Sequence, residues 1–431
     1  MLLFRVFSIP VRFFIALLIY FSWGPLAGGV VTAPVPEFSS PALIPYPSKV
    51  VRGAGEAGFR SVHVKVGPDV PGRDDLMKEI KDIFRTSGIQ GSLNSGGAAE
   101  GAMTWELFPD ARMKGEGYDL SVGLGKATVR AGSFGGFFNA LQTLRQLVFN
   151  REGEFAMPVV RISDKPAFVL RGIMLDVGRY YMSPALIKEM MRRLSRYKIN
   201  TLHLHLTDDP AWRLEVKKYP ALTDGAFHWK SRLPGRFYTQ AQLKDLTDYC
   251  ARLNIQVIPE IDMPGHSQPF SRAMKTGMQT EKGVSILKDV VDEAVSLFPG
   301  RFFHMGSDEA HISMKDFIPR MAEHIRGKGK EVVVWSPGGP HDKDSVLMCW
   351  GENEAGARMD KNMKRIDSNG FYIDWADSLS GVYQVFFQQP CEVPQGDDKA
   401  LGVIMPVWCD GNLSSEMRVL EQYPFYPCAL T

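Results

Sequence analysis

The apolar and polar positions between residues 34 and 165 predict a small domain of mixed strands and helices. Apolar side chains alternate with polar ones over several short stretches, and two longer stretches have helical spacing. The predicted strands are Ser61–Val66, Tyr118–Val122 and Ala127–Ala131, and the predicted helices are Asp74–Ser87 and Phe137–Val148. These residues include no cluster of polar side chains that would carry chemistry, so we expect this α+β domain to support its neighbour.

The pattern changes after Pro166, where short apolar strands alternate with amphipathic helices. This rhythm is typical of βα units around a parallel sheet, and eight strands predict a (β/α)₈ TIM barrel, an α/β fold, over residues 166–431. The predicted strands are Gly172–Val177, Thr201–Leu206, Gln256–Ile261, Phe302–Met305, Glu331–Trp335, Val346–Trp350, Phe371–Trp375 and Gly402–Trp408. The predicted helices are Pro184–Tyr197, Gln240–Leu253, Val284–Leu297, Met314–Gly327, Glu354–Lys364 and a short last helix at Ser414–Gln422, so we expect a short C-terminal end to the barrel.

The first 33 residues have the layout of a secretory signal peptide. Arg5 and Arg12 precede the apolar run Phe13–Phe21, and mostly small residues follow. The run is short for a transmembrane helix. We therefore expect an exported chain (periplasmic, extracellular or lumenal) with no stable membrane span after cleavage; an uncleaved anchor is the alternative.

The composition adds little to this picture. The chain has 431 residues, of which 45% are hydrophobic and 23% charged, and its net charge is +2. This balance gives no reason to expect nucleic acid as a partner. None of the five cysteines forms a CxxC pair, which argues against a zinc knuckle.

The clearest candidate for chemistry is the run from Phe302 to His311. Its apolar start predicts a buried strand, Gly306 and Ser307 allow a turn, and the adjacent carboxylates Asp308 and Glu309 follow. Adjacent carboxylates repel each other and resist burial, but they suit a site in which one is charged and one neutral. Both can face a cleft only if the backbone leaves strand geometry there. The alternative is an exposed pair that caps the next helix.

Other polar and aromatic residues fall near the carboxyl ends of predicted strands, where a barrel enzyme carries its site. Tyr372 and Asp374 are two residues apart and would share a strand face, as would Trp408 and Asp410. The complete set of candidates is Arg179, Asp208, Asp262, His266, Asp308, Glu309, Trp335, Trp350, Tyr372, Asp374, Trp408 and Asp410.

Four runs in the same order resemble glycoside hydrolase family 20, the β-N-acetylhexosaminidases. They are Met174–Tyr180 (MLDVGRY), Leu202–Asp209 (LHLHLTDD), Pro259–His266 (PEIDMPGH) and His304–Glu309 (HMGSDE). The likeness extends from about Pro166 to Asp410. It implies exo-acting hydrolysis of terminal, non-reducing, β-linked GlcNAc or GalNAc from a glycan, with no cofactor and no metal.

The resemblance also implies roles. The reaction would be substrate-assisted and retaining, with the sugar's own 2-acetamido oxygen as nucleophile. Glu309 would be the general acid/base, in a dry position, and Asp308 would stay ionised and orient the acetamide. Substrate would be bound by Arg179, Tyr372, Asp374, Trp335, Trp350, Trp408 and Asp410, with Asp208, Asp262 and His266 in support; family members more often have Glu at the position of Asp410.

Two other functions stay open at this point. A non-catalytic sugar-binding barrel would have the same fold, because fold alone does not fix function. A metal-dependent hydrolase would use His203, His205, His266, His304 and Asp308, whose side chains are suitable ligand types. The two histidines of the HxH run lie mid-strand, however, so they are better explained as core residues. The sequence leaves the oligomeric state unknown.

Overall fold

A computed structural model describes residues 42–94, 98–151, 153–351, 359–373, 385 and 387–410. The predicted signal peptide, Asp374 and the predicted helix Ser414–Gln422 lie outside these residues. Within the described part of the chain, no helix combines the length and apolar character that crossing a bilayer requires.

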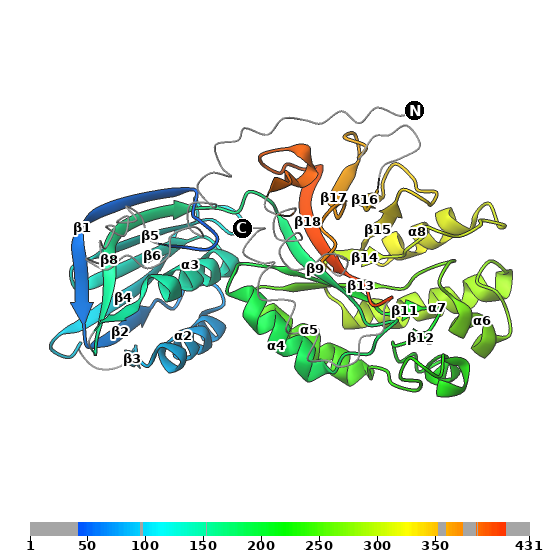
Figure 1. Cartoon of the computed structure of the whole chain (residues 1–431), viewed down its shortest axis with the longest axis horizontal. Helices are drawn as coiled ribbons and strands as arrows, with labels where there is room; N and C mark the ends of the chain where they lie inside the picture. The colour runs from blue at the N-terminus through cyan, green and yellow to red at the C-terminus, as the bar shows by residue number, and fades with distance from the viewer. Residues whose placement is uncertain are drawn as a thin grey trace, which may run out of the picture. The chain divides into compact units, whose positions relative to one another are not determined.

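The N-terminal domain is a sheet with two helices, as predicted (Figure 1). The strands run in the order β1-β8-β5-β6-β4-β2-β3, and β7 also pairs with β8. Helix α3 packs on β5 and β6 and also contacts α2, so both helices bury their apolar faces. The elements are β1 (Lys49–Phe59), β2 (Ser61–Val66), α2 (Arg73–Ser87), β3 (Gln90–Leu93), β4 (Ala102–Pro109), β5 (Tyr118–Gly123), β6 (Lys126–Ala131), α3 (Phe134–Leu147), β7 (Phe149–Arg151) and β8 (Glu154–Asp164).

Eight parallel strands then close a barrel in the order β10-β13-β14-β15-β16-β17-β18-β9, which confirms the predicted fold class. Side chains such as Met174, Ile258, Val333 and Ile404 fill its interior, so the barrel is a packed core. The strands are β9 (Leu170–Asp176), β10 (Thr201–His205), β13 (Gln256–Glu260), β14 (Phe302–His304), β15 (Glu331–Ser336), β16 (Val346–Cys349), β17 (Lys364–Asp367) and β18 (Ala400–Val407).

Helices follow the first strands, and shorter elements lie in the loops. A serine or threonine side chain caps α4, α5 and α7, which explains where these helices begin. The helices are α4 (Pro184–Ser195), α5 (Gln240–Arg252), α6 (Gln268–Met274), α7 (Glu281–Leu297) and α8 (Phe317–Gly327). The loop elements are β11 (Thr207–Asp208), β12 (Ala211–Trp212), η2 (Pro220–Thr223), η3 (Gly225–Phe227) and η4 (Pro390–Glu392).

The predicted seventh strand, Phe371–Trp375, is wrong. The seventh strand is β17, Lys364–Asp367, which pairs with β16 and β18. The apolar pattern did not predict β17, because three of its four residues are charged, although Arg365 to Asp367 are buried. Residues 371–373 follow Gly370, which has φ +78°, and lie in the loop beyond it. Tyr372 is therefore a loop residue, and strand alternation cannot place its side chain on the same face as that of Asp374.

The predicted helix Glu354–Lys364 is wrong over its described part, because residues 359–363 form loop and turn and Lys364 begins β17. The remainder of that prediction, up to residue 358, lies outside the described residues.

A partly buried carboxylate joins the N-terminal domain to the barrel. Glu116 accepts hydrogen bonds from Arg171 of β9, from Asn254 at 2.7 Å and from Asn200 at 3.2 Å. Burial disfavours its charge, but Arg171 and the two amides lower the pKa of Glu116 overall. These three barrel residues all lie at or just before the amino ends of their strands, so the domain is held at that end of the barrel.

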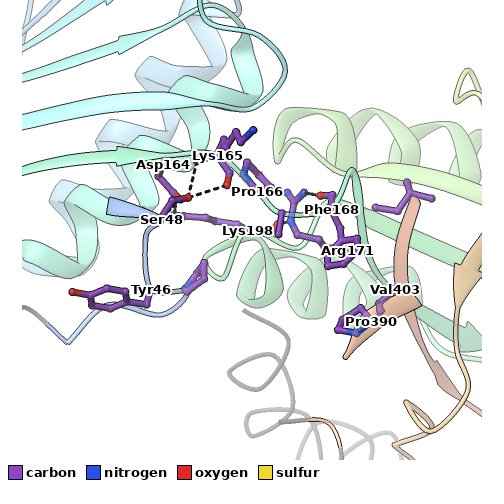
Figure 2. A pocket seen from close by; sticks show the side chains of 13 residues that line it. Tyr46, Ser48, Asp164, Lys165, Pro166, Phe168, Arg171, Lys198, Pro390 and Val403 are labelled. Carbon is purple, nitrogen blue, oxygen red and sulfur yellow. Dashed lines mark hydrogen bonds and ion pairs between the residues drawn. The ribbon is translucent and has the colours of Figure 1, made fainter. Parts of the chain in front are cut away.

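A second group of contacts at the same end surrounds a cavity of about 160 Å³ (Figure 2). The ammonium group of Lys198 lies 2.9 Å from Asp164 and 3.0 Å from the hydroxyl of Tyr118, and Ser48 donates to Asp164 at 2.9 Å. Two of the cationic groups at this cavity are paired, Lys198 with Asp164 and Arg171 with Glu116, and most of its other lining side chains are apolar, including Pro166, Phe168, Pro390 and Val403.

We predict that Glu116→Gln destabilises the protein by about 1–3 kcal/mol, because it leaves the partly buried Arg171 without its counter-ion. Glu154→Gln is the control. Glu154 pairs with Arg60 on the surface, where both side chains are more than 60% exposed, so its loss should cost less than about 1 kcal/mol. Urea unfolding of the two variants measures both values, and equal losses would contradict the anchoring role of Glu116.

Candidate active site

Arg179 gathers three carboxylates at the carboxyl ends of the strands. Its guanidinium lies 3.0 Å from Asp176, 3.0 Å from Asp208 and 3.1 Å from Asp410. It also lies over the ring of Trp408, 4.9 Å from the ring centroid. Burial disfavours its charge, but the carboxylates raise the pKa of Arg179 overall. The structure thus brings three predicted site residues, Arg179, Asp208 and Asp410, into direct contact.

The backbone breaks from strand geometry after β14, as the sequence predicts. Gly306, Ser307 and Glu309 all have positive φ, at +68°, +86° and +49°. Such angles are uncommon for side chains other than glycine, and they mark a backbone that its surroundings hold in place. As a result the two adjacent carboxylates lie in different environments: Asp308 is 9% exposed, whereas the Glu309 side chain is 59% exposed.

These exposures are the reverse of those expected for the pair. We expected a dry Glu309, but its side chain is open to solvent. Burial, followed by the charges of Glu260 and Glu309, raises the pKa of Asp308 to about 7. Close packing adds to this burial, because a Cβ added at Gly338 would lie 3.1 Å from the Cβ of Asp308.

The predicted supporting residues Asp208 and His266 link the Arg179 cluster to Glu309. One nitrogen of His266 lies 3.4 Å from Asp208 and the other lies 3.4 Å from Glu309. Burial opposes the charge of the ring, but Asp208 and Asp262 raise the pKa of His266 to about 9. His266 is therefore a cation at neutral pH and lies between two carboxylates.

Aromatic rings lie next to these charges. The ring of Trp408 lies 5.6 Å from that of Trp335 and 6.4 Å from that of Tyr372. Trp335 is buried, and its indole N–H donates to Glu260 at 2.7 Å. Trp350 is partly buried and packs against the same interior cluster. Three predicted aromatic residues thus form one group beside Arg179, and Trp350 packs on the core beneath them.

Within the described part of the chain, three groups of residues have ligand atoms close enough together to be considered for a metal. Asp262 belongs to one of them, and burial together with Glu260 raises the pKa of Asp262 well above its usual value, which disfavours a carboxylate ligand. His205 of that group and Asp208 of another already bond each other. The group of His203, Glu260 and His304 is completely buried, so an ion there would not meet a substrate. The groups are His203, Glu260 and His304; His205, Glu260 and Asp262; and Asp208, Asp209 and His266. We identify none of them as a metal site.

Sequence reasoning missed two carboxylates of this site. Asp176 ends β9 and accepts hydrogen bonds from the backbone N–H groups of Arg179 and Cys409. Glu260 ends β13 and contacts His203, His205, His304 and Trp335. A charged residue inside an otherwise apolar strand was the available signal, because such a charge is rarely buried without partners.

The fold and the site define a class of protein, a TIM barrel behind a small α+β domain with a carboxylate pair at the strand ends. Comparison with known families agrees with that class. Residues 168–283 match the catalytic domain of glycosyl hydrolase family 20, and residues 40–165 match domain 2 of the same family. The chain belongs to glycosyl hydrolase family 20.

The individual proteins to which the chain is similar are distant from it in sequence. The chain is 30% identical over 389 residues to a beta-hexosaminidase of Porphyromonas gingivalis, a match that covers 72% of this chain and 50% of the relative. It is 29% identical to a beta-hexosaminidase of Vibrio furnissii, covering 68% of this chain and 61% of the relative. The chain thus spans about half to three fifths of the length of these curated relatives. The beta-N-acetylhexosaminidase structure from Streptomyces coelicolor A3(2) is 26% identical, covers 90% of each chain and has a TM-score of 0.77.

We predict that Asp308 makes the protein less stable as the pH rises from about 4 to about 7. A carboxyl group whose pKa is higher in the folded state binds more protons when folded, so the free energy of unfolding falls with pH across this window. The pKa difference, from 3.8 to about 7, corresponds to on the order of 4 kcal/mol. Urea unfolding of the wild type and Asp308→Asn at several pH values measures the difference between them.

Asp110→Asn is the control for this measurement. Arg112 lowers the pKa of Asp110 to about 2. Asp110 therefore affects the pH dependence of stability only below about pH 4, and its effect has the opposite sign, because stability decreases there as the pH falls. A difference between wild type and Asp308→Asn that stays constant from pH 4 to pH 8 would contradict the raised pKa.

Proposed function

We propose that the chain is an exo-acting β-N-acetylhexosaminidase that removes terminal, non-reducing, β-linked N-acetylhexosamine from glycans by a substrate-assisted, retaining mechanism. The observation that carries the proposal is the division of the adjacent pair into a buried Asp308 and an accessible Glu309, next to Arg179 and the aromatic group. The family membership supports it. The related Streptomyces plicatus beta-hexosaminidase, 26% identical with a TM-score of 0.76, has a mutant structure in complex with its product GlcNAc.

Asp308 is the partner of the acetamide in this proposal. The acetamide oxygen attacks the anomeric carbon, and the bond from that carbon to the leaving oxygen breaks. Positive charge then develops on the oxazolinium ring, and an ionised Asp308 stabilises that charge and accepts from the acetamide N–H. A carboxylate in a largely water-free position acts strongly on such a charge, because little solvent screens it. A positive partner also lowers the pKa of Asp308 from its value of about 7.

Glu309 is the general acid and base. Its carboxyl group gives a proton to the leaving oxygen in the first step. In the second step it takes a proton from the water that attacks the anomeric carbon, the bond from that carbon to the acetamide oxygen breaks, and the sugar is released with its original configuration. The 59% exposure of this side chain suits a group that must reach both a leaving group and water. Bound sugar would cover Glu309 and favour its neutral form.

The remaining groups position the sugar. The Arg179 guanidinium has fixed donor directions for the outer hydroxyls of the sugar, and Asp410 next to it can accept from them. Trp335, Trp408 and Tyr372 supply flat faces for the ring and the acetamide group, and the Tyr372 hydroxyl is assigned to the acetamide oxygen. Asp374 is assigned to the same hydroxyls as Arg179 on the family resemblance alone.

We expect the purified chain to hydrolyse p-nitrophenyl β-GlcNAc and β-GalNAc, to be inhibited by a thiazoline analogue of the oxazoline, and to keep its activity in EDTA. Inhibition by the thiazoline reports the acetamide-derived intermediate, because the analogue has the shape of that intermediate. Binding of GlcNAc without turnover would support a non-catalytic sugar-binding barrel instead. Activity that EDTA abolishes and zinc restores would support a metal-dependent hydrolase.

We further predict that Glu309→Gln and Asp308→Asn fail in different ways. A nitrophenolate leaving group needs no proton, whereas a disaccharide does, and general acid catalysis contributes about 10²–10⁴-fold. Glu309→Gln should therefore lose much more kcat/KM on a disaccharide than on a nitrophenyl substrate. Asp308→Asn should lose similar amounts on both, because every substrate must form the oxazolinium. The opposite dependence would exchange the two roles.

A further inference from the structure

A single buried carboxylate beneath the candidate site contacts both the aromatic group and the linked charged residues of the site. Glu260 ends β13 and is completely buried. Its Oε1 atom accepts from the indole N–H of Trp335 at 2.7 Å. Its Oε2 atom lies 2.7 Å from Nδ1 of His205, whose Nε2 atom lies 2.8 Å from Asp208. No role for Glu260 or His205 follows from the resemblance or from the reaction derived above.

The His205 ring must carry a positive charge in this arrangement. Both of its nitrogens face carboxylate oxygens, which only accept hydrogen bonds when ionised, so both nitrogens must donate. Burial opposes this charge, but Glu260 and Asp208 raise the pKa of His205 well above its usual value. The buried groups therefore alternate in sign from Glu260 through His205, Asp208 and His266 to the carboxyl group of Glu309.

The other histidines around Glu260 do not replace His205 as its charged partner. His304 accepts from the N–H of Gly306 at its Nδ1 atom, so that atom carries no proton and cannot donate to Glu260. His203 lies 2.9 Å from Glu260 without hydrogen-bond geometry, and burial lowers its pKa to about 4, so it is neutral. The remaining charged groups that face this region are Asp176, Asp262 and Asp308.

We propose that Glu260 is a positioning residue of the candidate site, which orients the Trp335 indole through one oxygen and fixes the His205–Asp208–His266–Glu309 chain through the other. Its charge also acts on Asp308 through space. The link to catalysis rests on the proposed function; the effect on Asp308 does not.

Glu260→Gln tests both parts. Glutamine keeps the size of the side chain and can still accept from Trp335, but its amide group cannot accept from His205 at the same time, so His205 becomes neutral. Glu260 raises the pKa of Asp308 more than any other charge does, so loss of its negative charge favours ionisation of Asp308 and outweighs the loss of the His205 cation. The upper end of the pH window in which Asp308 affects stability is set by its folded-state pKa, and we expect that end to move down by on the order of one pH unit. The pH dependence of unfolding for Glu260→Gln with and without Asp308→Asn measures that window and requires no turnover.

The catalytic part is measured on the same proteins. We expect Glu260→Gln to lower kcat/KM by about 10–100-fold, as removal of partners behind a reacting group usually does, and to move the acid limb of its pH profile in the same direction as the stability window. Glu116→Gln is the matched control, because it removes a partly buried charge at the other end of the barrel. It should lose stability and leave the pH profile in place.

The outcomes are separable. A wild type without hydrolysis would overturn the proposed reaction, while the stability window would still decide whether Glu260 acts on Asp308. An unmoved window and an unmoved pH profile would overturn the inference. Should Glu260→Gln fail to fold, Trp335→Phe keeps the ring and removes only the bond to Glu260; a rise in KM of several-fold with an unmoved pH profile supports the positioning role, and an unchanged KM overturns it.

Discussion

The candidate site depends on holding several negative charges together around one cation, although two of them, Asp176 and Asp208, are buried. Asp176, Asp208 and Asp410 come from different parts of the chain and meet at the single guanidinium of Arg179. Carboxylates at such distances repel one another, and burial makes the repulsion stronger. A cation that cannot lose its proton resolves this conflict at every working pH. The position of Trp408 then follows, because its ring packs against the same guanidinium.

The same constraint extends below the surface of the site. Glu260 and Asp208 are compensated by His205, and Asp208 and Glu309 are joined by His266. Asp308 forms no ion pair within the described part of the chain, and burial with the charges of Glu260 and Glu309 outweighs the attraction of His266. This lack of compensation distinguishes it from the neighbouring acids. The proposed reaction uses the difference, because a developing positive charge on the substrate would supply the missing partner.

Much of this arrangement could be predicted from the sequence, and the failures have physical causes. Apolar runs located seven of the eight barrel strands, because a parallel strand buried on both faces is almost continuously apolar. The pattern failed at β17, where Lys364, Arg365 and Asp367 occupy a four-residue strand. Glu260 was missed for a related reason: its neighbours predicted a core strand, and only the contacts across the barrel show what its charge does. The exposure of Glu309 depends on three positive φ angles, which the sequence around Gly306 permits but does not specify.

The attachment of the N-terminal domain has a consequence for how this protein can change. Glu116 contacts Arg171, Asn200 and Asn254 at the amino ends of their strands, whereas the candidate site occupies the carboxyl ends. The joint between the domains and the candidate site are therefore separate sets of residues with the barrel core between them. A lineage, or an engineer, could adapt the joint to a new temperature while the sugar-facing loops diversify independently.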